Sequence, residues 1–362
     1  MRSLLILLLS ATAAMADVAL QWTPSTGGAV GYYIYRNGVR VGSSPTASYV
    51  DTTAAAGTQY SYEISAFDAA NNESGRSTAV VVNSLLAAFP TAANTGVPAG
   101  TTLTNYTGPN IITVPNTVID AKLVTGNLEI QTSGVVISRS KVNGGITLNT
   151  GLANASTWNF TVRDSEINVG GSLTIRGIEG WNFTALRNNI YGSYGGIYCA
   201  LNAVIQDNYV HGNALDPTGV AHMSGIRQEA SCTIRHNSIT CDAPVTPPDC
   251  CCSAALTGYP DFAIIQNNTI DRNLFVATPT GSYCAYGGST LGKPFSGQTN
   301  NIRFTNNIFQ KGSTNVCGAF AAVGDFDPVA TGNVWSNNKY DNGLFVCKDG
   351  ITAAATEAAC PP

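Results

Sequence analysis

Charged side chains are scarce in this sequence. Only 11% of its 362 residues are charged and the net charge is −4, whereas globular domains average about 25% charged residues. A nucleic-acid-binding protein is therefore disfavoured, because nothing supplies the dense Lys/Arg surface that neutralises phosphates. With three histidines and three methionines, a His-rich metal store is excluded. Beyond the N-terminus no apolar run reaches the roughly 18 residues that span a bilayer, so we expect no membrane insertion.

The first 16 residues have the features of a secretory signal peptide. Arg2 supplies a positive charge, residues 4–9 an apolar run, and Ala14-Met15-Ala16 a small-residue cleavage site. We therefore predict an exported, extracellular protein whose mature chain begins at Asp17.

Cysteine is absent from the first 198 residues, and ten cysteines follow. An even number in an exported chain indicates disulfides, although the sequence does not give their pairing. The triplet Cys250-Cys251-Cys252 stands beside no Cys-x-x-Cys pair. We interpret it as part of a disulfide-bonded surface loop rather than a metal site.

Residues 17–83 contain short alternating runs separated by turn residues. Asn37-Gly38 between two such runs predicts a β-hairpin. The segment resembles a bacterial fibronectin type III module in Trp22, in residues 31–38 and in the pair Tyr60 and Tyr62, which stands where that fold has its tyrosine corner. The resemblance implies a small β-sandwich that acts as a spacer or weak binder, and we assign it no chemistry.

The rest of the chain repeats one pattern: an apolar residue, two variable residues, Asn or Ser, one variable residue, then an apolar residue. Copies start 25, 23, 20, 29, 31 and 39 residues apart, a spacing typical of a solenoid with inserted loops. The repeated polar residue marks a turn where side chains bond along a ladder from coil to coil. We predict a right-handed parallel β-helix. The seven copies begin at Ile137, Val162, Ala185, Ile205, Ile234, Ile265 and Phe304.

The predicted domains are a signal peptide (1–16), a fibronectin type III-like module (17–83), a linker and N-terminal cap (84–116), and the β-helix with its C-terminal cap (117–362).

The stretch 89–103 and the repeats resemble the exported bacterial right-handed parallel β-helix repeat proteins of the pectate lyase-like superfamily. That family has His-x-Asp-Gly-Ile-Gln in a central coil, where this chain has His222-Met223-Ser224-Gly225-Ile226-Arg227. Ser224 and Arg227 replace the family's Asp and Gln, so a role for that carboxylate is lost. The resemblance implies action on a polysaccharide.

Alignment of the coils predicts which side chains lie side by side. Tyr198 and Arg227 stand at the same interval before their repeats, so we expect them to be outward neighbours. His211 and His222 bracket one inserted loop. Two further outward columns are expected: Lys141, Glu166, Asn189, Tyr209, Ser238 and Thr269 form the first, and Asn143, Asn168, Tyr191, His211, Thr240 and Asp271 the second.

These residues suit β-elimination of a uronate polysaccharide. The reaction needs a cation to neutralise the carboxylate, a base for the C5 proton and an acid for the leaving oxygen. We predict Arg227 as the cation, His222 or His211 as the base, and Tyr198 or Tyr209 as the acid. The predicted substrate-binding residues are Tyr191, Glu229, Arg235 and Lys141.

Two alternatives stay open. Hydrolysis needs two carboxylates about 5–10 Å apart, for which Asp164, Asp207, Asp216 and Glu229 are candidates. A non-catalytic glycan-binding adhesin suits the low charge equally well. We expect no cofactor and no metal, since calcium would require several clustered carboxylates, and we expect a monomer whose partner is an extended polysaccharide.

Overall fold

The computed structural model describes residues 4–5, 18–51, 53–54, 59–83, 89–248 and 251–361. The chain divides into two compact units between residues 88 and 89. Among the described residues the structure is all-β apart from two short 3₁₀ turns, at Ala155–Thr157 and Glu357–Ala359. No described helix has the length and apolar character needed to cross a membrane. Most of the predicted signal peptide, including its cleavage site, lies outside the described residues.

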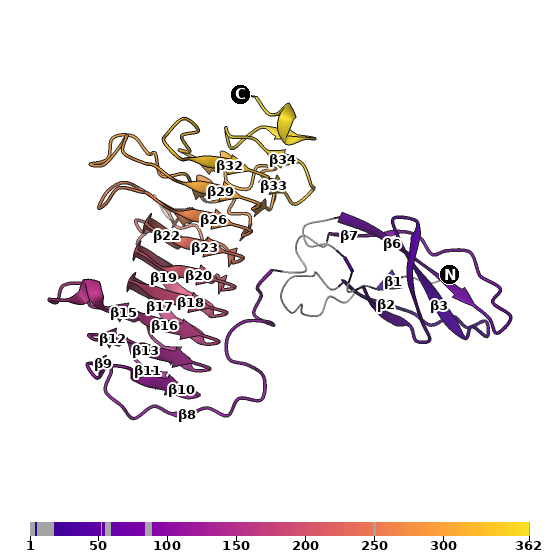
Figure 1. Cartoon of the computed structure of the whole chain (residues 1–362), viewed down its shortest axis with the longest axis horizontal. Coiled ribbons are helices and arrows are strands. Elements are labelled where there is room, and N and C mark those ends of the chain that lie inside the picture. The colour runs from indigo at the N-terminus through magenta and orange to yellow at the C-terminus, as the bar shows by residue number, and fades with distance from the viewer. Residues whose placement is uncertain are drawn as a thin grey trace. The chain divides into compact units, whose positions relative to one another are not determined.

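The N-terminal unit consists of two antiparallel sheets (Figure 1) around Trp22, Tyr32, Ile34 and Tyr62. The predicted hairpin forms, with Asn37 and Gly38 at positive φ between its two strands. The Tyr62 hydroxyl donates to the Asp51 carboxylate at 2.7 Å, rather than to a backbone group as at a tyrosine corner. The two sheets are β1 (Leu4–Leu5), β2 (Val18–Trp22) and β5 (Ser48–Asp51), and β3 (Gly31–Arg36), β4 (Val39–Ser44), β6 (Gln59–Phe67) and β7 (Val80–Asn83).

The C-terminal unit is a parallel β-helix, as predicted, because each strand pairs in parallel with the strand one coil later (Figure 1). One sheet has nine strands: β10 (Val118–Asp120), β13 (Val135–Ser138), β16 (Phe160–Arg163), β18 (Phe183–Leu186), β20 (Val204–Gln206), β23 (Thr233–Arg235), β26 (Thr269–Asp271), β29 (Arg303–Thr305) and β32 (Val334–Ser336).

The remaining strands of the β-helix belong to a second, bent sheet, because the long strands β17 and β19 join its two faces. Its members are β8 (Thr104–Asn105), β9 (Ile111–Ile112), β11 (Lys122–Thr125), β12 (Leu128–Ile130), β14 (Lys141–Asn143), β15 (Ile146–Leu148), β17 (Glu166–Trp181), β19 (Asn189–Leu201), β21 (Tyr209–Val210), β22 (His222–Ala230), β24 (Ser238–Ile239), β25 (Cys251–Thr257), β27 (Leu274–Phe275), β28 (Tyr283–Tyr286), β30 (Ile308–Phe309), β31 (Ala321–Gly324), β33 (Lys339–Tyr340), β34 (Phe345–Val346) and β35 (Ala353–Ala354).

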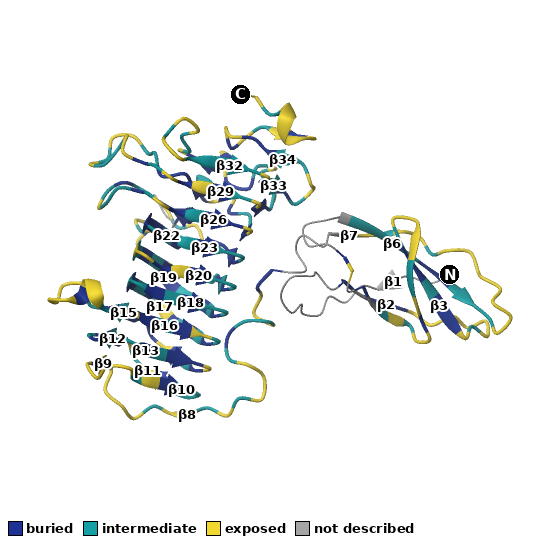
Figure 2. Cartoon of the chain, in the orientation of Figure 1, coloured by how far each residue is buried: buried dark blue, intermediate teal, exposed yellow. Residues whose placement is uncertain are grey.

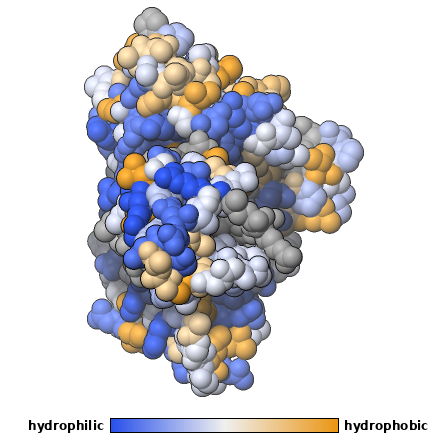
Figure 3. All heavy atoms as spheres, turned by 90° about the vertical axis from the view of Figure 1, so that its right-hand side faces the viewer, coloured by the Kyte–Doolittle hydropathy of each residue, from blue (hydrophilic) through white to orange (hydrophobic). Residues whose placement is uncertain are grey.

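The interior of the β-helix is filled by stacked Ile, Val, Leu and Phe side chains, which Figure 2 shows as buried strand positions. Stacks such as Ile137 on Val162 on Ala185 on Ile205 follow the predicted repeat. The first coil is entered by β8 and β9, and the last strands, β34 and β35, pair antiparallel. On the face drawn in Figure 3, apolar residues occur in small groups among hydrophilic ones, in keeping with the low charge.

The polar residues of the repeat form a buried ladder. Each backbone N–H donates to the side-chain oxygen one coil later, as from Asn188 to Asn208 and from Asn208 to Asn237, both at 2.9 Å. Each Asn amide also donates to a backbone carbonyl, so both groups are satisfied without water. The ladder consists of Ser140, Ser165, Asn188, Asn208, Asn237, Asn273, Asn307 and Asn338, all fully buried.

The predicted position of one copy of the repeat, the one that starts at Ile265, is wrong. Asn273, not Asn268, accepts the bond from Asn237 at 3.0 Å, so this copy starts at Ile270 rather than Ile265. The two stretches have the same spacing, and the correct one ends in Phe275 instead of Ile. Consequently Leu274, not Thr269, follows Ser238 in the first column, and both side chains are buried rather than exposed as predicted. Asp271 leaves the second column because it pairs with Arg235.

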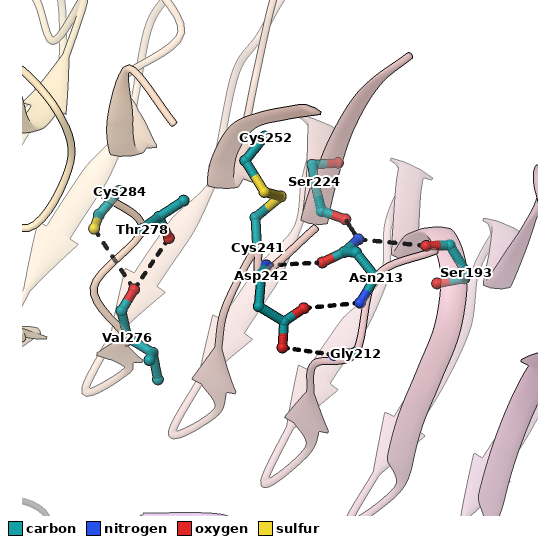
Figure 4. Close-up of a disulfide and its surroundings, with 10 residues drawn as sticks. All are labelled: Ser193, Gly212, Asn213, Ser224, Cys241, Asp242, Cys252, Val276, Thr278 and Cys284. Atoms are coloured by element: carbon teal, nitrogen blue, oxygen red, sulfur yellow. Dashed lines mark hydrogen bonds between the residues drawn. A yellow bond between two sulfur atoms is a disulfide. The ribbon is translucent and has the colours of Figure 1, made fainter. Parts of the chain in front are cut away.

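Four disulfides lie among the described residues, as the even cysteine count predicted: Cys199–Cys232, Cys241–Cys252, Cys284–Cys317 and Cys347–Cys360. The second one closes an inserted loop (Figure 4), where Asp242 accepts hydrogen bonds from the backbone of Gly212 and Asn213. The Asn213 amide in turn donates to the Ser193 and Ser224 carbonyls. This network fixes the loops between the two faces of the bent sheet. Cys250 lies outside the described residues.

Replacing Asn237 by alanine is expected to lower the free energy of unfolding by about 3 kcal/mol, since it leaves the buried Asn208 N–H without an acceptor. The matched control is Asn105→Ala, at an exposed asparagine of the first coil. Denaturant titration of both variants measures the difference. Equal losses in the two variants would show that the ladder contributes nothing particular to stability.

Candidate functional site

Seven of the nine predicted site residues fall into two groups on different parts of the bent sheet. The first group surrounds Arg227 on β22, and the second surrounds His211, just after β21. We call them the Arg227 cluster (Arg176, Tyr198, Arg227, Glu229, Asp261) and the His211 cluster (Lys141, Glu166, Tyr191, Tyr209, His211).

Tyr198 and Arg227 are register partners on β19 and β22, as predicted. The Tyr198 hydroxyl donates to Glu229 Oε1 at 2.6 Å, and Arg227 Nη2 lies 3.5 Å from the same oxygen and 3.6 Å from Asp261 Oδ2. Glu229 is only 5% exposed, whereas Asp261 is 26% exposed. One guanidinium nitrogen therefore holds two carboxylates, of which Asp261 is the more accessible.

Arg176 completes this cluster from β17. Its guanidinium carbon lies 4.3 Å from the centre of the Tyr198 ring, and its nearest described carboxylate, Glu179, is 3.9 Å away. Its Nη1 is buried and has no hydrogen-bond partner among the described residues. Burial lowers the pKa of Arg176 from its ordinary value, although arginine stays charged. Arg227 Nε is likewise buried without a partner among the described residues, so both cations of the cluster have an unused donor.

The protonation state of Tyr198 follows from its surroundings. Burial, followed by the hydrogen bond to the Glu229 carboxylate, raises the pKa of Tyr198 well above 10.0. A neutral phenol is consequently the stable form across the physiological range. It can donate a proton to a developing oxyanion.

The His211 cluster is held together by stacked rings. His211 lies parallel to Tyr209 with ring centroids 4.0 Å apart and 5.4 Å from Tyr191. The Tyr191 hydroxyl donates to Glu166, which also binds Lys141 at 2.8 Å. Burial and the hydrogen bond to Glu166 raise the pKa of Tyr191 to about 12.

His211 in this cluster is a neutral imidazole. Burial lowers its pKa below 6.5, so the ring is uncharged near pH 7. Its Nε2 is 2.8 Å from Asn189 Oδ1, and an amide oxygen only accepts. Nε2 therefore carries the proton, and the lone pair is on Nδ1.

His222 and Arg235 both lie away from Arg227. His222 begins β22, five residues before Arg227, which is about 16 Å along an extended strand. Arg235 lies on the nine-stranded sheet, where its Nε is 3.4 Å from Asp271. The predicted adjacency of Tyr198 and Arg227 is correct, whereas the predicted base His222 stands five residues from Arg227 on the same strand.

The carboxylates considered for hydrolysis are engaged elsewhere, except Glu229. Asp164 binds Arg187 at 2.6 Å, and Asp207 binds His236 Nδ1 at 2.6 Å, both at the turns after strands of the nine-stranded sheet. Asp216 is buried and accepts bonds from Thr218, Val220 and Ala221. Hydrolysis at these three residues is not favoured by their contacts.

Sequence reasoning missed Arg176 and Asp261. Arg176 follows register shifts in β17, between Asn168 and Ser172 and between Ser172 and Arg176, so the repeat spacing did not align it. Asp261 lies in a loop after β25, where it also binds Lys293 at 3.0 Å. Loop residues carry no periodic signal. Among the described residues no group of three or more His, Cys, Asp or Glu is arranged to hold a metal ion.

Comparison with known proteins gives partial matches. No family model matches the chain. It is 33% identical over 187 residues, 47% of its length, to an alpha-amylase of Niallia circulans, and 29% identical over 165 residues, 43% of its length, to exoglucanase B of Cellulomonas fimi. It is 44% identical over 68 residues to chitinase Chi52 of Paenibacillus xylanexedens. The chain spans only 12–15% of the length of these relatives.

Two solved structures align over most of the chain at low similarity. A Family 28 exopolygalacturonase of Yersinia enterocolitica has 12% identity and a TM-score of 0.23, covering 94% of this chain and 84% of its own. A pectate lyase of Pectobacterium carotovorum has 12% identity and a TM-score of 0.19, covering 85% and 86%. Neither likeness is close enough to place a residue or a reaction in this chain.

Proposed function

We propose that this protein is a secreted enzyme that binds an extended uronate-containing polysaccharide and cleaves it by β-elimination at the Arg227 cluster. The observation that carries the proposal is the protonated Tyr198 beside Arg176, whose guanidinium has an unused donor. Arg176, whose guanidinium carbon lies 4.3 Å from the centre of the Tyr198 ring, and the Tyr198 hydroxyl supply a cation and an acid, two of the three groups that elimination needs.

In the proposed mechanism Arg176 binds the substrate carboxylate and so acidifies the C5 proton. Asp261 takes that proton, because it is the exposed carboxylate of the cluster. Tyr198 gives its proton to the leaving oxygen as the C4–O bond breaks and the C4–C5 double bond forms. Proton exchange with water then restores both groups. Arg227 positions Glu229 and Asp261 around the reaction centre.

We place the reaction in the C-terminal unit and treat residues 17–83 as an accessory module of fibronectin type III type. The relatives bear on this choice. They are named for different polymers, and a poly(3-hydroxybutyrate) depolymerase of Ralstonia pickettii, 42% identical over 64 residues, is named for one that is not a carbohydrate. Matches of 64 and 68 residues have about the length of this module. We infer that these short matches fall on this module, since an accessory part suits enzymes of such different substrates better than a catalytic one.

Hydrolysis is the second candidate, favoured by one observation. Glu229 and Asp261 both lie within 3.6 Å of Arg227 Nη2, which suits the carboxylate spacing of glycosidases. The ultraviolet absorbance of an unsaturated product distinguishes elimination from hydrolysis, which yields only new reducing ends. If the protein binds uronate polymers but produces neither ultraviolet absorbance nor new reducing ends, the result would instead support a non-catalytic adhesin.

Replacing Asp261 by asparagine is expected to lower kcat for formation of the unsaturated product about a hundredfold, the size of a general-base contribution. Asp327→Asn, in a loop before β32, is the matched control and keeps wild-type activity. The initial rate of absorbance increase measures both variants. Wild-type activity in Asp261→Asn would remove this residue as the base.

A further inference from the structure

The face that carries the Arg227 cluster is acidic on its N-terminal side. In the register of the coils Glu129 pairs with Thr147, Thr147 with Glu179, Glu179 with Tyr198, and Tyr198 with Arg227. Glu179 therefore lies about 10 Å from Arg227, two strand spacings away, and is 31% exposed. Hydrogen bonds from Asn149 and Gln131 lower the pKa of Glu129, which keeps it ionised. A polymer along this face meets negative charge there.

The C-terminal side of the same face is aromatic. The Arg227 guanidinium lies 5.1 Å from the Phe262 ring, and Phe262 is 72% exposed. Further along, the Tyr283 ring lies 6.3 Å from Phe320, which is 68% exposed. Exposed rings of this kind stack on the apolar C–H faces of sugars, a contact that needs no charge on the sugar. This side offers stacking surfaces rather than partners for carboxylates.

The cations between these two sides are unequal. Arg227 faces two carboxylates, and Lys293 faces Asp261 at 3.0 Å, so their charges are compensated. Arg176 pairs more loosely, with Glu179 at 3.9 Å, and its side chain is 21% exposed, against 12% for Arg227. Each of these two arginines has one buried nitrogen without a partner among the described residues, Nη1 of Arg176 and Nε of Arg227. The face thus accommodates one carboxylate at Arg176.

We propose that the substrate is a heteropolymer in which isolated uronate residues are flanked by neutral sugars, and that Glu179 excludes polymers with a carboxylate on every residue. The inference rests on the proposed function. In a homopolymer of uronates, the sugar next to the one at Arg176 would bring its carboxylate toward Glu179, and like charges at this range, within a Debye length of about 8–10 Å, repel each other.

The test compares two polymers in the unsaturated-product assay. Polygalacturonate carries a carboxylate on every sugar, and a rhamnogalacturonan backbone alternates uronate with a neutral deoxyhexose. We expect kcat/KM to be at least about tenfold higher on the alternating polymer, and Glu179→Gln to lower that preference ratio about tenfold. The amide keeps the size of the side chain, so the Thr147 contact at 3.2 Å is retained.

The aromatic side is tested separately. Phe262→Ala and Phe320→Ala each should raise KM on the alternating polymer about fivefold, the size of one lost stacking contact, while Val329→Ala, at a side chain 89% exposed, serves as the control.

Each outcome decides between the proposals. A preference for polygalacturonate, or an unchanged ratio in Glu179→Gln, overturns the heteropolymer inference and leaves elimination standing. Cleavage of neither polymer overturns the proposed function itself, and the inference with it. Unchanged KM in both Phe variants would show that the polymer does not extend over the C-terminal coils.

Discussion

Replacing Tyr198 by phenylalanine is expected to lower kcat about a thousandfold on the uronate polymer, with KM nearly unchanged. The variant lacks only the hydroxyl that donates to Glu229 at 2.6 Å. In the proposed mechanism it loses the proton for the leaving oxygen, and general acids contribute about 10²–10⁴-fold. The ring remains to pack against Arg176, so substrate binding is retained.

The pH profile separates an acid role from a structural one. Burial and the hydrogen bond to Glu229 raise the pKa of Tyr198. Tyr198 therefore keeps its proton at every pH below this raised pKa and loses it only when the pH rises through the pKa. Wild-type activity should therefore show no alkaline decline from this group up to about pH 10, where an ordinary tyrosine titrates. A decline near pH 7–8, or wild-type kcat in Tyr198→Phe, would contradict the assignment.

Loss of the hydroxyl also leaves the buried Glu229 with one partner fewer. A thermal unfolding midpoint within a few degrees of wild type is expected, since one hydrogen bond to a charged group is worth about 1.5–3 kcal/mol. A variant that is both unfolded and inactive would report on packing instead of catalysis. The pH profile of the wild type would then remain the test of the acid.

The β-helix could be predicted from the sequence because the same pattern of apolar and polar residues recurs in each coil and has a physical cause. A polar residue at the same place in successive coils is tolerated in a core only if each copy satisfies the next, as Asn188, Asn208 and Asn237 do. The adjacency of Tyr198 and Arg227 followed from equal spacing to the next repeat. Two overlapping stretches, around Asn268 and Asn273, have the same spacing, so the pattern alone did not show which asparagine belongs to the ladder.

The rest of the site was not accessible to that reasoning. Periodicity places residues on strands, but Asp261 is positioned by a loop and Arg176 follows breaks in register. The loop between the two predicted histidines belongs to a small core of its own, with Met223 and the Cys241–Cys252 disulfide, which the repeat spacing does not describe. The repeat thus predicted the β-helix and the neighbouring pair Tyr198 and Arg227. The inserted segments determine which charged side chains contact each other.

Replacing Arg176 by alanine is expected to lower kcat/KM about a thousandfold, or roughly 4 kcal/mol of transition-state stabilisation. In elimination the negative charge spreads onto the carboxylate as C5 loses its proton, so a cation at that point acts most strongly in the transition state. Most of the loss should fall on kcat. Initial rates over a range of polymer concentration separate kcat from KM.

Two comparisons show whether geometry or charge alone is required at this position. Arg176→Lys should recover only about tenfold of the loss, because an ammonium cannot form the paired hydrogen bonds of a guanidinium fork to a carboxylate. Arg163→Ala, at a 46% exposed arginine on the nine-stranded sheet, should keep wild-type rates. If Arg176→Ala retained activity while Arg227→Ala lost it, the carboxylate would bind at Arg227, and Glu229 and Asp261 would have to release that guanidinium for the substrate.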